Sequence, residues 1–317
     1  MPKDPRTYSW KIDSLNNTIL DKIWASSPHD VYVAGKSKNY ESLACMWHFN
    51  GLLWKPIELP EAESDGVYSN VVSIYGFSSV NLWAITYVVT DFKNNFKCDI
   101  LHFDGNIWKN SLTVNGISLK CIWGNSPSDI WAGGDTLLLH FDGSNWSQFS
   151  FLIPPQNASI NSICGLSSND IYLTGHKPDS NTPISYLYHF NGSQWSLIDS
   201  SYGFTGNEKF GWALKTIGGT LYSYHNYLYE RMGNIWTKIY SNPIAAMGGN
   251  SSNNLFVETM YDNGTINHYN GIDWEKLSIN EGFYGRMEDI WVNETEVFMV
   301  ATGIVDNHWT TFVVQGK

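Results

Sequence analysis

The sequence carries little charge. Charged residues make up 15% of its 317 residues, with 19 Lys and Arg against 30 Asp and Glu and a formal net charge of −11. Globular proteins usually contain about 25% charged residues. Because Lys and Arg form no run longer than two, nothing offsets the repulsion between this chain and a phosphate backbone. We therefore expect no nucleic-acid partner.

Long apolar runs are also absent. No stretch approaches the roughly 18 apolar residues that a membrane span requires, and the longest candidate, Leu82 to Val89, has the length of a strand. We expect no membrane insertion of this chain. The residues Met1 to Tyr8 contain no apolar core of a secretory signal, although a chain cut after such a signal would read the same way.

Motifs of catalysis and metal binding are missing as well. The four cysteines, Cys45, Cys98, Cys121 and Cys164, have no CxxC or other zinc-ligand spacing, so we interpret them as small buried residues. The sequence has no Gly-x-Ser-x-Gly elbow, His-Glu-x-x-His helix or phosphate loop. We expect no cofactor and no metal, and we name no catalytic residue. Residues from separate repeats could still assemble an active site without a local motif.

What the sequence does contain is a repeat. One copy reads Ile122-Trp-Gly-Asn-Ser-Pro-Ser-Asp-Ile-Trp-Ala-Gly-Gly134, and it is followed by Leu139-His-Phe-Asp-Gly-Ser-Asn-Trp146. Variants of it extend along the whole chain. The final Trp occurs seven times, at intervals of 38 residues (Trp108 to Trp146) to 54 residues (Trp54 to Trp108): Trp10, Trp54, Trp108, Trp146, Trp195, Trp236 and Trp274.

Each repeat reads as four strands, which is the length of one propeller blade. The last copy stops at Gly316 before any Trp, and Trp10 fits the vacant position. The pattern therefore predicts an all-β, seven-bladed β-propeller with four antiparallel strands per blade, in a single domain over residues 1–317. Its last blade would combine residues from about 288 to 317 with residues 7–13, so that the N-terminal strand closes the ring and covers an exposed edge.

Two further positions of the repeat have structural interpretations. Asp-Gly or Asn-Gly before the fourth strand favours a tight type I′ hairpin, whose two central residues need positive φ. An aromatic residue recurs in the second strand and is expected to fill the gap between blades: Tyr32, Trp83, Trp131, Tyr172, Tyr222, Phe256 and Phe298.

The repeat resembles that of secreted or surface-anchored bacterial propellers, which read Ile-Trp-Gly-x-Ser-x-x-Asp-Val-Trp-Ala-x-Gly and His-Tyr-Asp-Gly-x-x-Trp. More distantly it is similar to tectonin-like propeller lectins, through the Asp-x-Ile-Tyr strand and the repeated Trp. The resemblance implies an extracytoplasmic protein, secreted, periplasmic or anchored like a lipoprotein at the cell surface. It implies no particular activity.

Five histidines occupy one repeat position: His48, His102, His140, His189 and His268. Ring symmetry would hold these positions many ångströms apart, whereas zinc ligands must meet within about 2 Å of one ion. We interpret them as structural residues that bond backbone or a neighbouring blade. We likewise interpret the repeated acidic residues, such as Asp129, as turn residues that bond backbone amides.

The loops that vary between repeats are where recognition is expected. The joins between strands two and three, and between blades, differ greatly in length, and in a propeller both sets open on one face. Aromatic and cationic side chains in these segments would suit a glycan or a protein surface. The predicted ligand-binding residues are Tyr68, Tyr202, Phe204, Tyr284 and Arg286.

Two functions remain open at this point. The first is a monomeric, non-catalytic module that binds a glycan or a protein through the variable-loop face, and the residue pattern favours it. The second is a propeller glycoside hydrolase or lyase with an axial active site. Its acid/base pair would come from Glu61, Glu63, Asp65, Glu208, Tyr284, Arg286 and His308.

Overall fold

The computed structural model describes residues 8–15, 18–37, 45–60, 68–90, 93, 95–149, 158–177, 184–202, 209–260, 264–279, 283, 285–305 and 308–317. The side chains of Ser37, Tyr68, His308 and Trp309 are not included. All regular structure in these ranges is β-strand, and they contain no helix long and apolar enough to cross a membrane. The chain divides into two compact units, Pro60–Asn242 and the combination of Met1–Leu59 with Pro243–Lys317.

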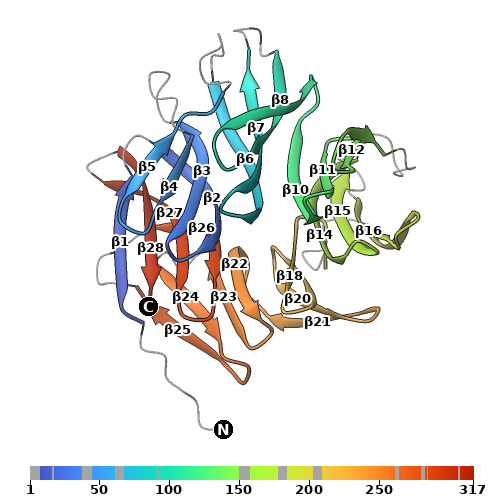
Figure 1. Ribbon diagram of the computed structural model, residues 1–317. Coiled ribbons are helices and arrows are strands. Elements are labelled where there is room, and N and C mark those ends of the chain that lie inside the picture. The colour runs from blue at the N-terminus through green and yellow to red at the C-terminus, as the bar shows by residue number, and fades with distance from the viewer. Residues whose placement is uncertain are drawn as a thin grey trace. The chain divides into compact units, whose positions relative to one another are not determined.

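The unit Pro60–Asn242 consists of successive antiparallel meanders, in which each strand pairs with the next (Figure 1). Its strands are β6 (Tyr68–Ser78), β7 (Asn81–Val89), β8 (Phe96–Phe103), β9 (Trp108–Asn115), β10 (Leu119–Ser126), β11 (Asp129–Gly134), β12 (Leu137–Phe141), β13 (Trp146–Gln148), β14 (Ser159–Ser167), β15 (Asp170–Lys177), β16 (Ile184–Phe190), β17 (Trp195–Tyr202), β18 (Ala213–Ile217), β19 (Thr220–Tyr224), β20 (Leu228–Met232) and β21 (Ile235–Tyr240).

The other unit contains both ends of the chain, side by side in one sheet (Figure 1). Its strands are β1 (Trp10–Leu15), β2 (Thr18–Ser27), β3 (Asp30–Ser37), β4 (Met46–Phe49), β5 (Trp54–Ile57), β22 (Ile244–Ser251), β23 (Asn254–Thr259), β24 (Thr265–Tyr269), β25 (Trp274–Ser278), β26 (Arg286–Val292), β27 (Val297–Val305) and β28 (His308–Gly316). Strand β1 pairs antiparallel with β28, from Trp10 opposite Gly316 to Leu15 opposite Thr311.

The prediction of seven four-stranded blades is wrong. The described residues form five four-stranded blades: β10–β13, β14–β17, β18–β21, β22–β25, and the sheet in which β26, β27, β28 and β1 are neighbours in that order. Strands β2 to β9 do not divide into two further sheets of four. The N–H and C=O groups of an edge strand can pair with any strand that lies beside it. Counting copies of a motif therefore counts hairpins and does not count separate sheets.

The turn before the fourth strand also differs from the prediction. Phe141 pairs with Trp146, which leaves a four-residue loop rather than a two-residue type I′ turn. The Asp142 carboxylate accepts hydrogen bonds from the backbone N–H groups of Ser144 and Asn145, both at 2.8 Å. Gly143 has the positive φ, 95°. A short acidic side chain that bonds its own backbone thus closes the turn.

A β-bulge recurs near the start of the first strand of a sheet. Register shifts occur between Leu119 and Cys121 in β10 and between Ile160 and Ser162 in β14, and others in β2, β6, β22 and β26. The repeated glycine at the end of the second strand lies opposite the bulge, where a Cβ on Gly134 would approach Ser118 O to 2.0 Å. A bulge leaves one residue unpaired and re-aims its side chain.

The repeated histidines are structural, and their bonds go to side chains rather than to backbone. His140 Nε2 lies 2.9 Å from Asp129 Oδ1 and its ring packs on Trp131, with centroids 4.2 Å apart. Trp131 Nε1 donates to the same carboxylate at 3.0 Å. The turn aspartate thus ties the second strand to the third. Equivalent contacts join His48 to Asp30, His102 to Asn81, His189 to Asp170 and His268 to Asn254.

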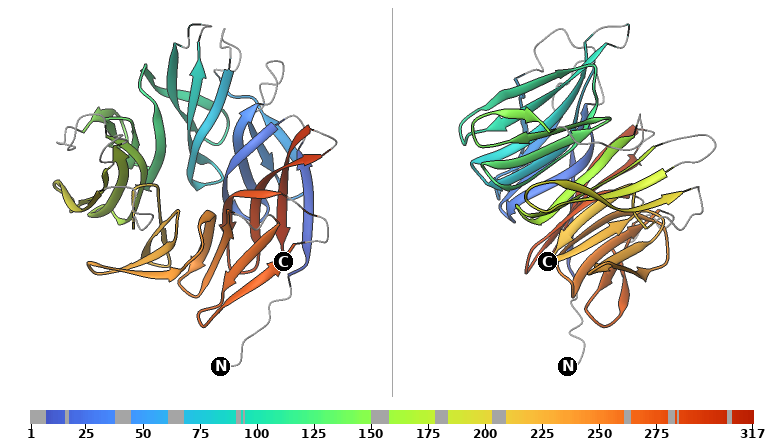
Figure 2. Two further views of the ribbon diagram at one scale, coloured as in Figure 1. Left: turned by 180° about the vertical axis from the view of Figure 1, so that it is seen from behind. Right: turned by 90° about the vertical axis from the view of Figure 1, so that its right-hand side faces the viewer.

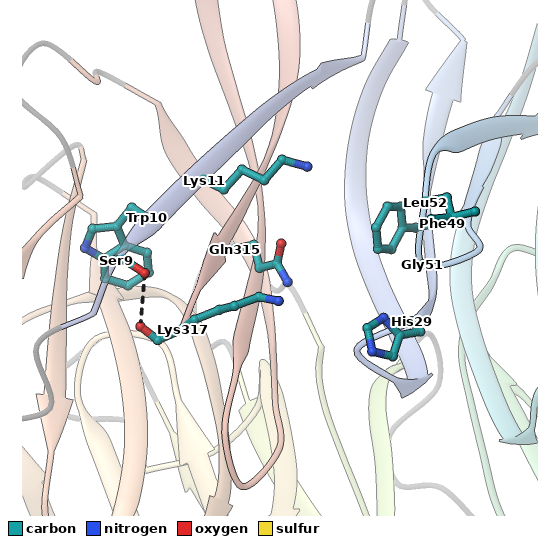
Figure 3. A pocket seen from close by; sticks show the side chains of 9 residues that line it. All are labelled: Ser9, Trp10, Lys11, His29, Phe49, Gly51, Leu52, Gln315 and Lys317. Carbon is teal, nitrogen blue, oxygen red and sulfur yellow. Dashed lines mark hydrogen bonds between the residues drawn. The ribbon is translucent and has the colours of Figure 1, made fainter.

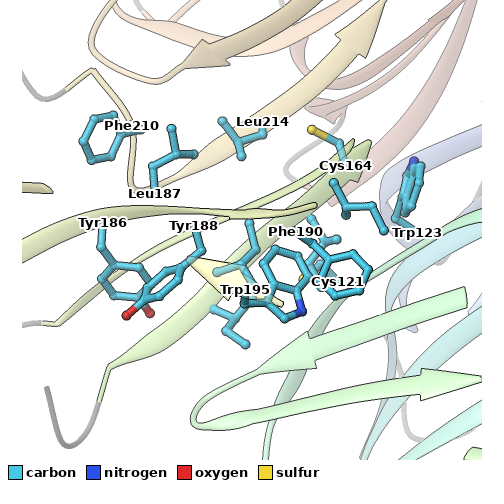
Figure 4. Close-up of a cluster of buried hydrophobic side chains, with 14 of the residues drawn as sticks. Cys121, Trp123, Cys164, Tyr186, Leu187, Tyr188, Phe190, Trp195, Phe210 and Leu214 are labelled. Carbon is cyan, nitrogen blue, oxygen red and sulfur yellow. The ribbon is translucent and has the colours of Figure 1, made fainter. Parts of the chain in front are cut away.

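The core of the unit Pro60–Asn242 lies between neighbouring sheets (Figure 4). In both views of Figure 2 the sheets that contain β10 and β14 lie next to each other. The predicted filling of the gap by second-strand aromatics is confirmed for Trp131, Tyr222 and Phe256, each at most 1% exposed. All four cysteines are buried, as predicted, and they form no disulfide bonds with one another.

Candidate binding site at the variable-loop end

Each sheet has two ends that differ in their loops. The end at which the first strand begins and the second strand finishes is called the variable-loop end. The opposite end is called the short-turn end. In the sheets β14–β17 and β18–β21, the variable-loop end holds Ser159 and His176, which pair, and Ala213 and Tyr224, which also pair. These two sheets contact each other through β14 and β18, so their variable-loop ends are adjacent.

Three aromatic rings are stacked at this place. The ring of His176, near the end of β15, lies 4.6 Å from that of Trp212 with an interplanar angle of 30°. The ring of His225 also stacks on Trp212, with ring centroids 4.7 Å apart and an interplanar angle of 27°. Although two rings stack on it, Trp212 remains 43% exposed. The stack therefore presents aromatic surface to solvent.

The bulge residue of β14 holds the stack in place. Asn161 is unpaired in the register, and its amide Nδ2 donates to Gly211 O at 2.7 Å and lies 2.7 Å from His176 Nδ1. An amide has two N–H donors, so both bonds form when His176 Nδ1 is unprotonated. Asn161 thus fixes both the chain that leads to Trp212 and the ring of His176.

His176 is held neutral by its surroundings. Burial lowers its pKa, and the positive charge of Lys120 lowers it further. Lys120 is the bulge residue of β10, and its ammonium donates to Ser159 Oγ at 2.5 Å and lies 3.6 Å from the Asp135 carboxylate. Three sheets therefore contribute to one polar and aromatic site.

The outer part of the site is a crevice beside His225. Lys209, Phe210, Tyr224 and Tyr227 line it together with Trp212, Ser223 and His225, and these side chains fill its interior. The ammonium of Lys238 lies 4.2 Å from the ring centroid of Tyr227, a cation–π contact. The surface is an aromatic-rimmed patch with lysines around it, and the crevice itself is not a deep pocket.

A second non-repeating feature lies at the variable-loop end of the other unit. Glu258 is fully buried in β23, at the position that Ala34, Gly133 or Val300 occupies in other second strands. Its Oε2 accepts a hydrogen bond from the Met287 backbone N–H at 2.6 Å, while Oε1 has no hydrogen-bond partner among the described residues. Burial raises the pKa of Glu258 to about 9, and the charge of Glu288 adds to this, so Glu258 is protonated at neutral pH.

The residues predicted from the sequence have the following places. Tyr202 ends β17 and is 63% exposed, and the Arg286 side chain is 53% exposed, with Nε 4.0 Å from Glu288 Oε1. Tyr68 begins β6, but its side chain, like Phe204 and Tyr284, lies outside the described residues. The acid/base candidates Glu61, Glu63, Asp65 and Glu208 and the His308 side chain also lie outside them. No three metal-ligating side chains gather in the described parts of the chain.

Sequence reasoning missed the residues that form the stack. Trp212 is a tryptophan that matches no position of the repeat, and this irregularity was a usable signal. His225 and Asn161 have no such signal. A polar residue at a bulge is recognised only when the register of the strands is known.

Comparisons with known proteins establish the fold. No family model and no curated protein matches the chain. Among solved structures, YCF48 bound to a D1 peptide superimposes with a TM-score of 0.65 at 10% identity, over 99% of this chain and 96% of that one. Sqt1 of Chaetomium thermophilum, bound to the N-terminus of ribosomal protein L10, gives a TM-score of 0.52 at 11% identity, over 89% of this chain and 82% of that one.

A bacterial structure is similar as well. The extracellular domain of a one-component system protein from B. thetaiotaomicron gives a TM-score of 0.63 at 11% identity, and the match covers 96% of this chain but 40% of that one. Identities this low define the fold alone. Together with the strand order, these matches show that the chain is an all-β propeller.

Proposed function

We propose that this chain is a non-catalytic propeller that binds a peptide segment of a partner protein at the variable-loop end of the sheets β14–β17 and β18–β21. The observation that carries the proposal is the His176–Trp212–His225 stack, which is partly exposed at Trp212 and held by the hydrogen bonds of Asn161. Aromatic side chains with adjacent cations are enriched at protein interfaces. A rigid scaffold spares such a site the entropic cost of ordering when it binds.

Two of the similar propellers support a peptide rather than a sugar as the ligand. Their structures contain a D1 peptide and the N-terminus of a ribosomal protein. In the present chain two histidine rings already stack on Trp212, which reduces the ring surface left for a ligand. A pyranose that stacks on a tryptophan needs a free face, whereas an extended peptide can run across ring edges and bond the neighbouring lysines. Glycan binding and an extracytoplasmic location stay predictions from the repeat resemblance.

A pair of screens tests the class of ligand. A random-peptide display library is selected against the wild-type protein, and the same preparation is applied to a glycan array. We expect enriched peptides whose binding is lost in Trp212→Ala and His225→Ala, and no glycan signal above background. Glycan binding that the same two substitutions remove, without any enriched peptide, would replace the peptide proposal with a lectin.

A further inference from the structure

A second cavity lies at the short-turn end of the unit that contains both chain ends. Its volume is about 330 Å³, which is enough for one or two side chains of a ligand. One side consists of β1 and the end of β28, and the other of the turns that follow β2 and β4 (Figure 3). The lining residues are Ser9, Trp10, Lys11, His29, Phe49, Gly51, Leu52, Gln315 and Lys317.

The cavity exists because the two chain ends pair. Ser9 N donates to Lys317 O at 2.9 Å and Lys317 N to Ser9 O at 3.1 Å, which fixes both lysines of the cavity on one wall. Gly316 leaves room for the ring of Trp10, because a Cβ at this residue would lie 2.4 Å from Trp10 Cζ3. The wall that carries the cations is therefore part of the folded sheet.

The opposite wall is apolar. Phe49 is buried, with its ring centroid 6.0 Å from the ammonium of Lys11. Leu52, at the tip of the turn, is 86% exposed. Figure 3 shows Lys11, Gln315 and Lys317 extending towards His29, Phe49 and Leu52 across the cavity. A ligand in this space would contact positive charge on one side and hydrocarbon on the other.

Two lysines, Lys11 and Lys317, line the cavity in a protein of net charge −11. None of its lining residues is acidic. Lys11 pairs with Asp13 at 3.0 Å and Lys317 with Glu296 at 3.2 Å, but the two lysine side chains remain 59% and 54% exposed. An ammonium carries three N–H donors, so each lysine can keep its ion pair and donate to a ligand carboxylate as well.

We propose that this cavity binds an acidic peptide segment in which a carboxylate side chain stands next to an aromatic or aliphatic one. The carboxylate lies between Lys11 and Lys317. The Gln315 Nε2 donates one N–H to Glu296 Oε2 at 2.6 Å and has a second N–H for the ligand. The apolar side chain packs on Phe49 and Leu52. This site is independent of the aromatic stack, because every lining residue belongs to the unit of Met1–Leu59 with Pro243–Lys317.

Two blocked peptides test the proposal, acetyl-Leu-Phe-Glu-amide and the matched acetyl-Leu-Phe-Gln-amide. Binding to the full chain is followed by NMR through the tryptophan indole N–H signals. We expect the Glu peptide to bind at least 10-fold more tightly than the Gln peptide, and this preference to weaken as salt rises. Equal affinity for the two peptides, or no binding of either, would overturn the proposal.

Charge-neutralising variants locate the site. The double variant Lys11→Gln/Lys317→Gln should abolish the preference for Glu, while Lys36→Gln/Lys55→Gln, at exposed lysines that do not line the cavity, should keep it. Leu52→Ser should weaken the binding of both peptides to the same extent. If inorganic phosphate at equal concentration displaced the Glu peptide completely, the cavity would be an anion site and the peptide assignment would be wrong. A preference that survives the double variant would also contradict it.

Discussion

The two ends of the sheets differ in how far their contacts repeat. At the short-turn end, the bond between His140 and Asp129 in one sheet matches the bond between His189 and Asp170 in the next. At the variable-loop end, the His176–Trp212–His225 stack has no counterpart among the described residues. A contact that recurs once per sheet serves the packing that every sheet needs. One that occurs once is free to serve binding, and the following experiments test this division.

The largest effect is expected at a repeated position. Trp131 is 1% exposed and packs against His140 and Trp195, so Trp131→Ala should lower the free energy of unfolding by about 3 to 5 kcal/mol. Urea denaturation of the variant measures this loss. Trp212→Ala, at a half-exposed ring, should cost less than about 1 kcal/mol. Equal losses would show that the stack is part of the core.

The second prediction concerns Glu258 and the pH dependence of the free energy of unfolding. Its pKa is 4.5 in the unfolded chain and about 9 in the folded one, so folding retains a proton between these values. The stabilisation is complete below pH 4.5 and is lost as the pH rises towards 9. At roughly 1.4 kcal/mol per pH unit, the free energy of unfolding should fall by up to about 4 kcal/mol between pH 5 and 8.

The variant Glu258→Gln removes the titrating carboxyl group and keeps the shape of the side chain. Its free energy of unfolding should depend much less on pH over the same range than that of the wild type. Thermal melts at several pH values give the slopes. The same slope in Glu258→Gln as in the wild type would mean that Glu258 is ionised in the folded protein.

A smaller effect concerns His176. Because burial and Lys120 lower its pKa, NMR titration of its ring proton should give a midpoint below 6.5. Lys120→Met should move that midpoint upwards, since one of the two causes is removed. Folding excludes a proton from His176, so the free energy of unfolding falls as the pH drops from 6.5 through the midpoint. If Lys120→Met left the midpoint unchanged, the charge of Lys120 would not be a cause of the lowered pKa of His176.

Much of the fold could be predicted from the sequence because it repeats. The spacing of the tryptophans and the Asp-Gly turns indicated antiparallel hairpins, and the recurring second-strand aromatics indicated the core. The number of separate blades could not be predicted, because the pairing of edge strands depends on which backbone groups lie next to each other. The tryptophan of the fourth strand is buried in three copies, Trp108, Trp195 and Trp236, and half-buried at Trp146.

For the candidate site, the sequence indicated the face of the molecule but not the residues. Loop length pointed to the variable-loop end, yet the selection of Tyr68, Tyr202, Phe204, Tyr284 and Arg286 relied on residue type alone. The stack depends on bulges at Lys120 and Asn161 that turn single side chains out of the ladder. A bulge depends on the register between two paired strands, here consecutive ones, and residue types alone do not give that register.

The central claim is that the selected peptides bind the His176–Trp212–His225 stack, at the variable-loop end of the sheets β14–β17 and β18–β21. The most direct test is calorimetric titration of one selected peptide into wild type, Trp212→Ala and Ile235→Ala. Ile235 is 69% exposed at the short-turn end of the same unit, so it is a matched control. We predict that Trp212→Ala raises Kd at least 10-fold and that Ile235→Ala leaves it unchanged. A Kd that rises in Ile235→Ala and not in Trp212→Ala would place the binding surface at the repeated end and contradict the claim.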